Sequence, residues 1–228
     1  MLRRSFLLVA GVGALAVACH RDASPTPEDV SPQQKIVERA ALAVDRMRAS
    51  GQFPALDALL KRCRGVMVFP RLVKAGLIFG GEGGNGVLLS RDASGRLSAP
   101  AFYSLGAGSL GAQIGYQEAT VLLFFMTDAA LLSAINRGLT LGADTALAAG
   151  TLGSSGEAAS TNTGRDIYQL VDVGGLFAGA SLDGTVVGAR EEFNRAYYGP
   201  DATTYRIVVE RRFATPGSSR LEAALTPR

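Results

Sequence analysis

The pattern of apolar and polar positions after residue 30 predicts two helices. Ser31 provides a side-chain cap, Pro32 suits the first helical position, and Gln34 stands where a capping box places a glutamine. Apolar residues then recur at helical spacing as far as Gly51, at Ile36, Val37, Ala40, Val44 and Met47. A second, shorter helix follows, and its buried side is expected to consist of Leu56, Leu59, Leu60 and Cys63.

From residue 65 onward the pattern changes to short apolar runs separated by glycines, which is typical of strands. The expected strands are residues 66–69, 77–79, 87–90, 101–105, 121–126, 167–171, 176–180, 186–187 and 206–209. Turn signals occur at 92–95 and 183–184, and helical patterns occur at 128–136 and 191–197. We therefore expect an α+β fold with a strongly bent, mostly antiparallel sheet and the N-terminal helices packed on it. The sheet is either open or closed into a barrel-like form.

Glycine accounts for 28 of the 228 residues, well above the usual ~7%. The pattern Gly81-x-Gly83-x-x-Gly86 matches a dinucleotide-binding loop, but such a loop needs a helix that begins at its last glycine. Residues 87–90 are strand-like, so no cofactor is expected. Glycine within strands marks bulges and close backbone contacts. We expect Gly84 either to have a positive φ or to lie under a crossing backbone.

The first 30 residues are predicted to lie outside the folded domain. Residues 1–18 combine a short basic region with an apolar stretch that is too short to span a bilayer, which indicates an export signal. Small residues precede Cys19, as in a bacterial lipobox, so Cys19 is the expected site of lipid attachment. Residues 19–30 form a polar, proline-containing tether, and residues 31–228 form a single domain. Both the general and the twin-arginine export routes remain open.

Few residues in this chain can support catalysis. The only histidine, His20, adjoins the proposed lipid anchor, which excludes a histidine-based nucleophile pair and a histidine metal site from the domain. Ser109 lies in a loose match to a nucleophile elbow but has no base to activate it. Cys63 is expected to be a small buried hydrophobe. The sequence therefore predicts a protein that is not an enzyme and that binds no metal or other cofactor.

The main electrostatic feature is a run of basic residues without acids between residues 58 and 81, which contains Lys61, Arg62, Arg64, Arg71 and Lys74. Some of them could simply complement the dipole at the end of the second helix. Nucleic acid is not an expected partner, because the run lacks interleaved aromatic residues. Contact with the head groups of anionic phospholipids fits better, since cations near such a surface are favourable.

An ordered series of motifs resembles the SYLF domain family. The motifs are Gly65-Val-Met-Val-Phe-Pro70, Lys74-Ala-Gly76, Gly80-Gly-Glu-Gly-Gly-Asn-Gly-Val87, Ser98-Ala-Pro100, Gly108-Ser-Leu-Gly111, Leu141-Gly-Ala-Asp144 and Tyr198-Gly199. The resemblance covers about residues 35 to 200. It implies binding of acidic phospholipids through basic residues near the N-terminal helix and the Pro-x-x-x-Lys segment, where Lys74 is the positional match. The resemblance implies no enzymatic activity.

Together these features predict a bacterial lipoprotein that is anchored in a membrane on its periplasmic side and contacts anionic phospholipids. His20 follows the anchor cysteine where an aspartate is the usual signal for inner-membrane retention, so the outer membrane is expected. The alternative is a structural or interaction protein that binds another envelope protein or peptidoglycan.

Overall fold

The computed structural model describes residues 30–76, 79–110, 115–141, 166–173 and 184–228. All the described helices and strands belong to one compact unit, Ser31–Arg228. The helices are α1 (Pro32–Ala49), α2 (Leu56–Arg62), α3 (Asp128–Arg137), α4 (Glu191–Tyr198), α5 (Thr204–Val208), the 3-10 helix η1 (Pro216–Ser218) and α6 (Ser219–Leu225). The strands are β1 (Gly65–Gly76), β2 (Phe79–Ser90), β3 (Ala101–Leu110), β4 (Gly115–Phe125), β5 (Leu139–Thr140), β6 (Ile167–Val173) and β7 (Val186–Ala189).

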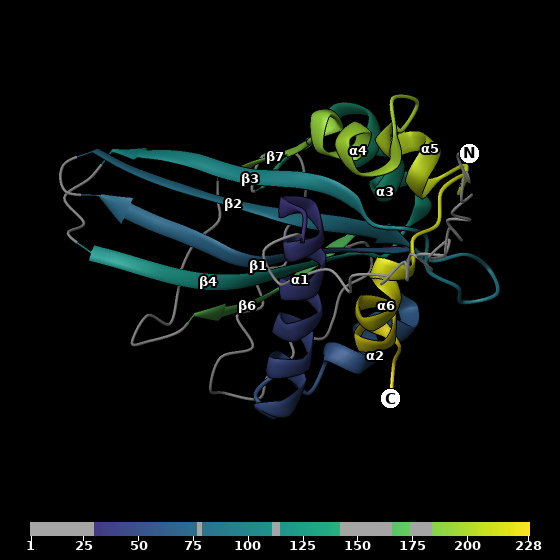
Figure 1. The fold of residues 1–228 in the computed structure, drawn as a ribbon. Coiled ribbons are helices and arrows are strands. Elements are labelled where there is room, and N and C mark those ends of the chain that lie inside the picture. The colour runs from purple at the N-terminus through teal and green to yellow at the C-terminus, as the bar shows by residue number, and fades with distance from the viewer. Residues whose placement is uncertain (1–29, 77–78, 111–114, 142–165, 174–183) are drawn as a thin grey trace, which may run out of the picture. The chain divides into compact units, whose positions relative to one another are not determined.

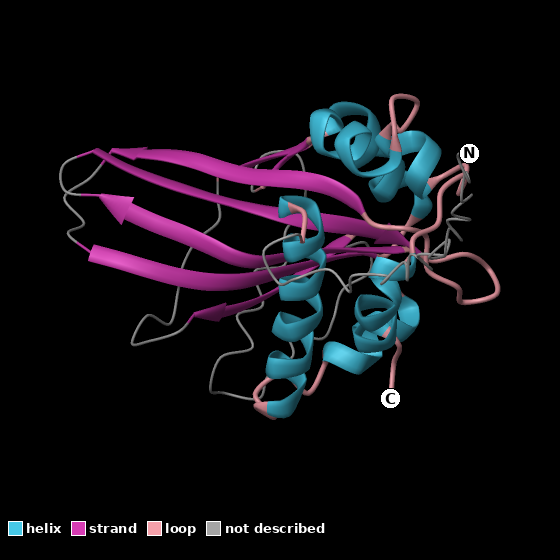
Figure 2. Cartoon of the chain, in the orientation of Figure 1, coloured by secondary structure: helices cyan, strands magenta, loops and turns pink. Residues whose placement is uncertain are grey.

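The strands form one sheet in the order β5-β7-β3-β2-β1-β4-β6, and each described pairing is antiparallel. The sheet is curled, and the described helices gather at one end of its long strands, as Figures 1 and 2 show. The predicted α+β fold with a bent antiparallel sheet is therefore confirmed. The strands β1 to β4 are longer than their apolar runs. In β2 and β3 the ladder continues through the neighbouring glycine-rich residues, and in β1 and β4 it continues through residues 71–76 and 115–120.

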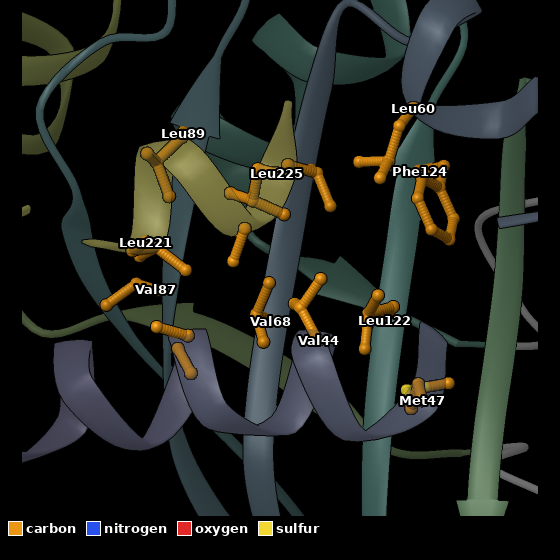
Figure 3. Packing of buried hydrophobic residues seen from close by; sticks show 14 of the residues in the cluster. Val44, Met47, Leu60, Val68, Val87, Leu89, Leu122, Phe124, Leu221 and Leu225 are labelled. Carbon is orange, nitrogen blue, oxygen red and sulfur yellow. The ribbon is translucent and has the colours of Figure 1, made fainter. Parts of the chain in front are cut away.

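One face of the sheet is covered by α1, α2 and α6, and the residues between them form the first core. Val44 and Met47 of α1 and Leu221 and Leu225 of α6 pack on Val68, Val87, Leu89, Leu122 and Phe124 of the strands (Figure 3). Leu60 of α2 lies beside Phe124 in the same core (Figure 3), and the predicted buried side of α2 is confirmed. In α1, Ile36 is only partly buried, and Ala41 and Ala43 join the buried side instead.

The opposite face carries the second core, against which α3 and α5 pack. It contains Met67, Phe69 and Leu72 of β1, together with Tyr103 of β3 and Leu123 of β4. The strand interiors are therefore buried on both faces in this part of the sheet. This arrangement explains why these segments read as continuous apolar runs rather than as alternating patterns.

A bulge in β1 around Pro70 changes the register of the sheet. The pairing with β2 shifts between Val68 and Arg71, and the pairing with β4 shifts between Phe69 and Leu72. Proline has no N–H for the ladder, so a bulge is a place where a sheet tolerates it. The Pro70 carbonyl accepts a hydrogen bond from the Thr120 hydroxyl at 3.1 Å. The extra residue bends the strand and increases its local twist.

The glycines opposite this bulge allow the backbones to approach closely. A Cβ atom built on Gly84 would lie 2.5 Å from the Arg71 carbonyl oxygen and 3.3 Å from the Leu72 Cα atom. One built on Gly86 would overlap the Val68 carbonyl and the ring of Phe69. Of the two reasons expected for Gly84, the close backbone is the one the structure supports, since its φ is not among the positive values.

The start of α1 confirms one half of the predicted capping box. The Ser31 hydroxyl accepts a hydrogen bond from the Gln34 amide at 3.1 Å. The Gln34 side chain does not return to Ser31. It donates to the carbonyl oxygen of Gly217 at 3.0 Å and accepts a hydrogen bond from the Tyr197 hydroxyl. This glutamine therefore joins α1 to η1 and α4.

The predicted strand at 206–209 is wrong, because this segment lies largely in α5. The Thr203 hydroxyl accepts from the Arg206 amide at 3.3 Å and caps the helix, while Ile207 and Val208 are buried in the second core. The β-branched apolar run favours a strand, but the capping residue Thr203 before it starts a helix instead. The expected strand at 176–180 lies outside the described residues. The C-terminal helix α6 was not expected.

The predicted helices at 128–136 and 191–197 correspond to α3 and α4. Of the two predicted turns, the one at 92–95 is present, with Gly95 at φ 85°, and in the other Gly184 has φ 79°. The buried Asn194 side chain accepts from the Phe102 amide at 2.8 Å and donates to the Thr204 hydroxyl at 3.0 Å. This side chain therefore ties α4 to β3 and α5.

Replacing Gly84 by alanine should destabilise the domain by about 1–3 kcal/mol, because the new methyl group meets a backbone that cannot move aside as a side chain would. This corresponds to a fall in Tm of several degrees. Gly83 is the matched control, since a Cβ there would lie at an ordinary 3.8 Å from the Leu105 carbonyl oxygen. Thermal unfolding of G84A and G83A by circular dichroism tests the difference. Equal melting temperatures would contradict the close approach.

Candidate anion-binding surface

The five predicted lipid-contacting cations do not form one cluster. Lys61 and Arg62 end α2, and Arg64 immediately precedes β1. Arg71 and Lys74 lie further along β1. Because a strand advances by 3.2–3.4 Å per residue, Arg71 is about 20 Å or more from Arg64 along the chain. The strand therefore divides the run into a group at the end of α2 and a group on β1.

The group at the end of α2 is exposed and little engaged. Lys61 and Arg62 form no ion pair or side-chain hydrogen bond with any residue that the structure describes. The Arg64 guanidinium lies 3.9 Å from the Asp128 carboxylate, and their side chains are 49% and 74% exposed. A pair this long and this exposed contributes little. The positive charges of these three residues are therefore available to a partner, in addition to their favourable position at a helix C-terminus.

In the group on β1, Arg71 is paired with an acid. The Nε and Nη2 atoms of Arg71 both donate to Oε1 of Glu118, at 2.9 Å and 2.6 Å. Much of the charge of Arg71 is therefore compensated by a residue of the adjacent strand β4. The backbone of Lys74 pairs with those of Glu82 and Gln117, but its side chain lies outside the described part of the structure.

A second set of exposed cations lies on the outer side of α1 and was missed from the sequence. Lys35, Arg39 and Arg46 are exposed, and none has an ion pair among the described residues. Between them Leu42 is 44% exposed, although it is a large hydrophobic residue. The spacing i, i+4, i+7 and i+11 places all four on one side of the helix. This helical spacing is visible in the sequence, although the cations themselves are spread over twelve residues and form no dense run.

Arg48, near the end of the same helix, is bound to other residues of the domain, unlike the exposed cations of α1. Its guanidinium pairs with Asp57 at 2.9 Å and donates to the Ala224 carbonyl at 2.8 Å. The hydrogen bond between Arg48 and Asp57 is the main cause that lowers the pKa of the Asp57 carboxyl, and burial partly offsets it. Arg48 therefore fastens α1 to α2 and α6, and it is not available to a partner.

Comparison with known proteins places the domain in a family. A family model described as "Ysc84: Las17-binding protein actin regulator" matches residues 106–227, more than half of the chain. The chain belongs to the Ysc84 family. The SYLF resemblance is thereby confirmed at the level of the family, since SYLF and Ysc84 denote the same domain.

Relatives with known names occur in fungi and animals. Protein YSC84 of Saccharomyces cerevisiae is 32% identical over 174 residues, which are 75% of this chain and 37% of that protein. LAS seventeen-binding protein 3 of the same yeast is 32% identical over 69% of this chain and 35% of its own length. The SH3 domain-containing YSC84-like protein 1 of Mus musculus is 30% identical, over 66% and 44%. The chain thus spans about two fifths of these relatives. No solved structure matches it significantly.

Within the described part of this Ysc84 domain, no three His, Cys, Asp or Glu side chains gather as a metal site would require. No described helix has the length and apolar character needed to cross a bilayer. Cys63 is 2% exposed, and burial raises the pKa of its thiol, partly offset by the charge of Arg91. A thiol in this setting is a poor nucleophile, in agreement with its expected role as a small buried hydrophobe.

Cys63 in residues 31–228 should therefore resist thiol reagents such as dithionitrobenzoate at pH 8 while the protein is folded. Both the raised pKa and the burial reduce the amount of accessible thiolate at that pH, so labelling should be far slower than for free glutathione. Unfolding in urea should restore full labelling of one thiol, which serves as the control. Rapid labelling in the absence of denaturant would show that the thiol is accessible and reactive.

Proposed function

We propose that this chain is a non-catalytic binding module of the bacterial envelope whose domain contacts the head groups of acidic phospholipids. The observation that supports it best is the state of the exposed cations of α1 and α2. Lys61, Arg62 and Arg64, together with Lys35, Arg39 and Arg46, have only one long contact to an acid within the described residues. Both helices pack on the same face of the sheet, in the first core.

The energetics of such a contact follow from the number of charges. Each Lys or Arg close to an anionic bilayer contributes about 1 kcal/mol, and the effect falls within a Debye length. Three cations at the end of α2 would then contribute about 3 kcal/mol, and those of α1 a similar amount if both sets reach the surface. Leu42, exposed among the cations of α1, adds apolar area that can enter the head-group layer.

We further propose that a lipid on Cys19 keeps the protein on the membrane, with residues 1–18 as the export signal and 19–30 as the tether. Residues 1–29 lie outside the described structure. A diacylglyceryl group supplies two acyl chains, which hold a protein stably where a single chain does not. The cations would then orient the domain rather than retain it. Because His20 replaces the usual inner-membrane aspartate, the proposed location is the periplasmic side of the outer membrane.

A protein partner is the alternative function, and the names of the relatives favour it. One family description refers to Las17 binding and actin regulation, and several relatives are named for an SH3 domain. Those names describe proteins that are longer than this chain. For this chain, the corresponding alternative is an interaction with another envelope protein or with peptidoglycan.

Flotation with vesicles separates the two functions. Residues 31–228 should float with vesicles that contain phosphatidylglycerol, and less so at high salt. The variant K61Q/R62Q/R64Q should bind about a hundredfold more weakly, which corresponds to the loss of about 3 kcal/mol. A second variant, K35Q/R39Q/R46Q, measures the contribution of α1 separately.

The matched control removes three exposed cations elsewhere, in R137Q/R195Q/R212Q. This variant has the same net charge but should keep most of the binding, since these residues lie on α3, on α4 and after α5. An equal loss in the control would mean that only net charge matters. Equal flotation with vesicles of phosphatidylcholine alone, or no flotation with either, would favour the protein partner.

The anchor is tested by replacing Cys19 with serine in the full chain. Serine cannot accept the diacylglyceryl group as a thioether, so the variant should accumulate as an unprocessed precursor and lose labelling by radioactive palmitate. The wild-type chain, expressed in parallel, is the positive control, and C63S controls for the second cysteine. Normal palmitate labelling of C19S would exclude Cys19 as the attachment site.

A further inference from the structure

A cleft of about 550 Å³ opens between the β2–β3 turn and the segment that leads from α5 to α6. Its volume is in the range of small-molecule sites. Leu97, Ala99, Phe213 and Pro216 give it apolar walls, while Arg96, Arg211 and Glu222 contribute charge. None of the cations assigned to the anionic membrane surface lines it, so the cleft is a separate feature of the domain.

The cleft is held in shape by Arg211. This residue has φ 53°, which is unfavourable for a side-chain-bearing residue and needs support from its surroundings. Its Nη2 atom donates to the carbonyl oxygens of Ser90 and Arg96 and to the Ser90 hydroxyl, each at 3.1 Å. These bonds tie the segment after α5 to both ends of the β2–β3 turn. The two walls are thus fixed relative to each other before any ligand arrives.

Two charged groups of the cleft retain unused hydrogen-bonding capacity. Arg96 is 82% exposed at its side chain, and only its Nε atom is engaged, with Asp92 at 3.3 Å. Both of its Nη atoms are therefore without a partner among the described residues. Glu222 accepts a hydrogen bond from the Ser218 hydroxyl at Oε1, which leaves Oε2 without one in the same part of the chain. Arg96 and Glu222 do not pair with each other.

We propose that this cleft binds a zwitterionic phosphate ester of the phosphoethanolamine type. The phosphate would accept hydrogen bonds from the Nη groups of Arg96, since a guanidinium presents a planar fork that matches phosphate oxygens. The primary ammonium would donate to Oε2 of Glu222. The carbon atoms beside the phosphate would lie on Leu97 and Phe213.

Other ligand classes match the cleft less well. A purely anionic head group would meet the Glu222 carboxylate without a counter-charge, and a purely apolar ligand would remove Arg96 and Glu222 from water without a partner. A zwitterion satisfies both groups at once. Phosphoethanolamine occurs both as a free solute and as a lipid head group, and the cleft has apolar surface that only the lipid would use fully.

Binding is measured by NMR titration of residues 31–228, which contain both cores and every described hydrogen bond. The probes are O-phosphoethanolamine, dihexanoylphosphatidylethanolamine and dihexanoylphosphatidylglycerol, with the lipids below their micellar concentrations. Shifts should concentrate at residues 96–99 and 211–222. Tighter binding of the ethanolamine lipid than of the free ester identifies a lipid ligand, and equal binding identifies a free zwitterion. The glycerol lipid should bind about tenfold more weakly than the ethanolamine lipid.

The variants R96A and E222Q should each weaken binding of the ethanolamine lipid by about tenfold, the usual loss for one charge-assisted hydrogen bond. In E222Q the amide oxygen can still accept from Ser218, so the fold is preserved. R212A is the control, since Arg212 is exposed, pairs with Glu210 and does not line the cleft. Unchanged binding in R96A and E222Q, equal binding of the glycerol lipid, or no binding by the wild type would overturn the proposal.

This result is independent of the proposed membrane contact. R96A and E222Q should float with anionic vesicles as the wild type does, and K61Q/R62Q/R64Q should bind the short-chain ethanolamine lipid normally. Loss of both properties in every variant would indicate general unfolding, which circular dichroism of each variant detects.

Discussion

The bulge at Pro70 in the central strand β1 is the constraint on which the rest of the fold depends. In a regular strand, Phe69 and Leu72 would point to opposite faces, because their separation is odd. Both side chains lie in the second core, because the extra residue at the bulge turns Leu72 to the same face of the sheet as Phe69. Each neighbouring strand has to follow this change, and β2 does so by placing Gly84 and Gly86 where any side chain would collide with β1. The local bend and twist of β1, and the close approach of β2 to it, follow from this geometry.

The same strand determines how the positive charge is distributed. The basic run from Lys61 to Lys74 is continuous in the sequence, but it spans the end of α2 and most of β1. In three dimensions an extended strand carries Arg71 away from the end of α2 and brings it beside Glu118. Charge density along a chain therefore predicts a surface cluster only within a helix or a tight turn. On α1 the cations lie eleven residues apart in sequence, from Lys35 to Arg46, yet they share one side.

The sequence was sufficient for the parts of the fold that depend on local signals. The cap at Ser31, the buried side of α2, the helices α3 and α4 and the turn at 92–95 each rest on a few adjacent residues. It was insufficient where tertiary contacts decide. Gln34 bonds to Gly217 and Tyr197 rather than back to its own helix, and Ile207 and Val208 are buried in a helix rather than in a strand. The cleft is assembled from residues more than a hundred positions apart, and no spacing in the sequence indicates it.

The arginines of this domain divide according to how many of their donors are already used, and this division bears on what each can recognise. Arg48 and Arg211 are held by several hydrogen bonds to backbone carbonyls, so they have lost rotamer freedom and fix elements in place. Arg62 and Arg39 are exposed and keep that freedom, and a flexible, exposed cation responds to charge more than to shape. Arg96 lies between these cases, with one nitrogen held and two unused, beside a wall that Arg211 holds in position. Recognition there would depend on ligand geometry and less on salt, whereas contacts through α1 and α2 would weaken steadily as salt increases.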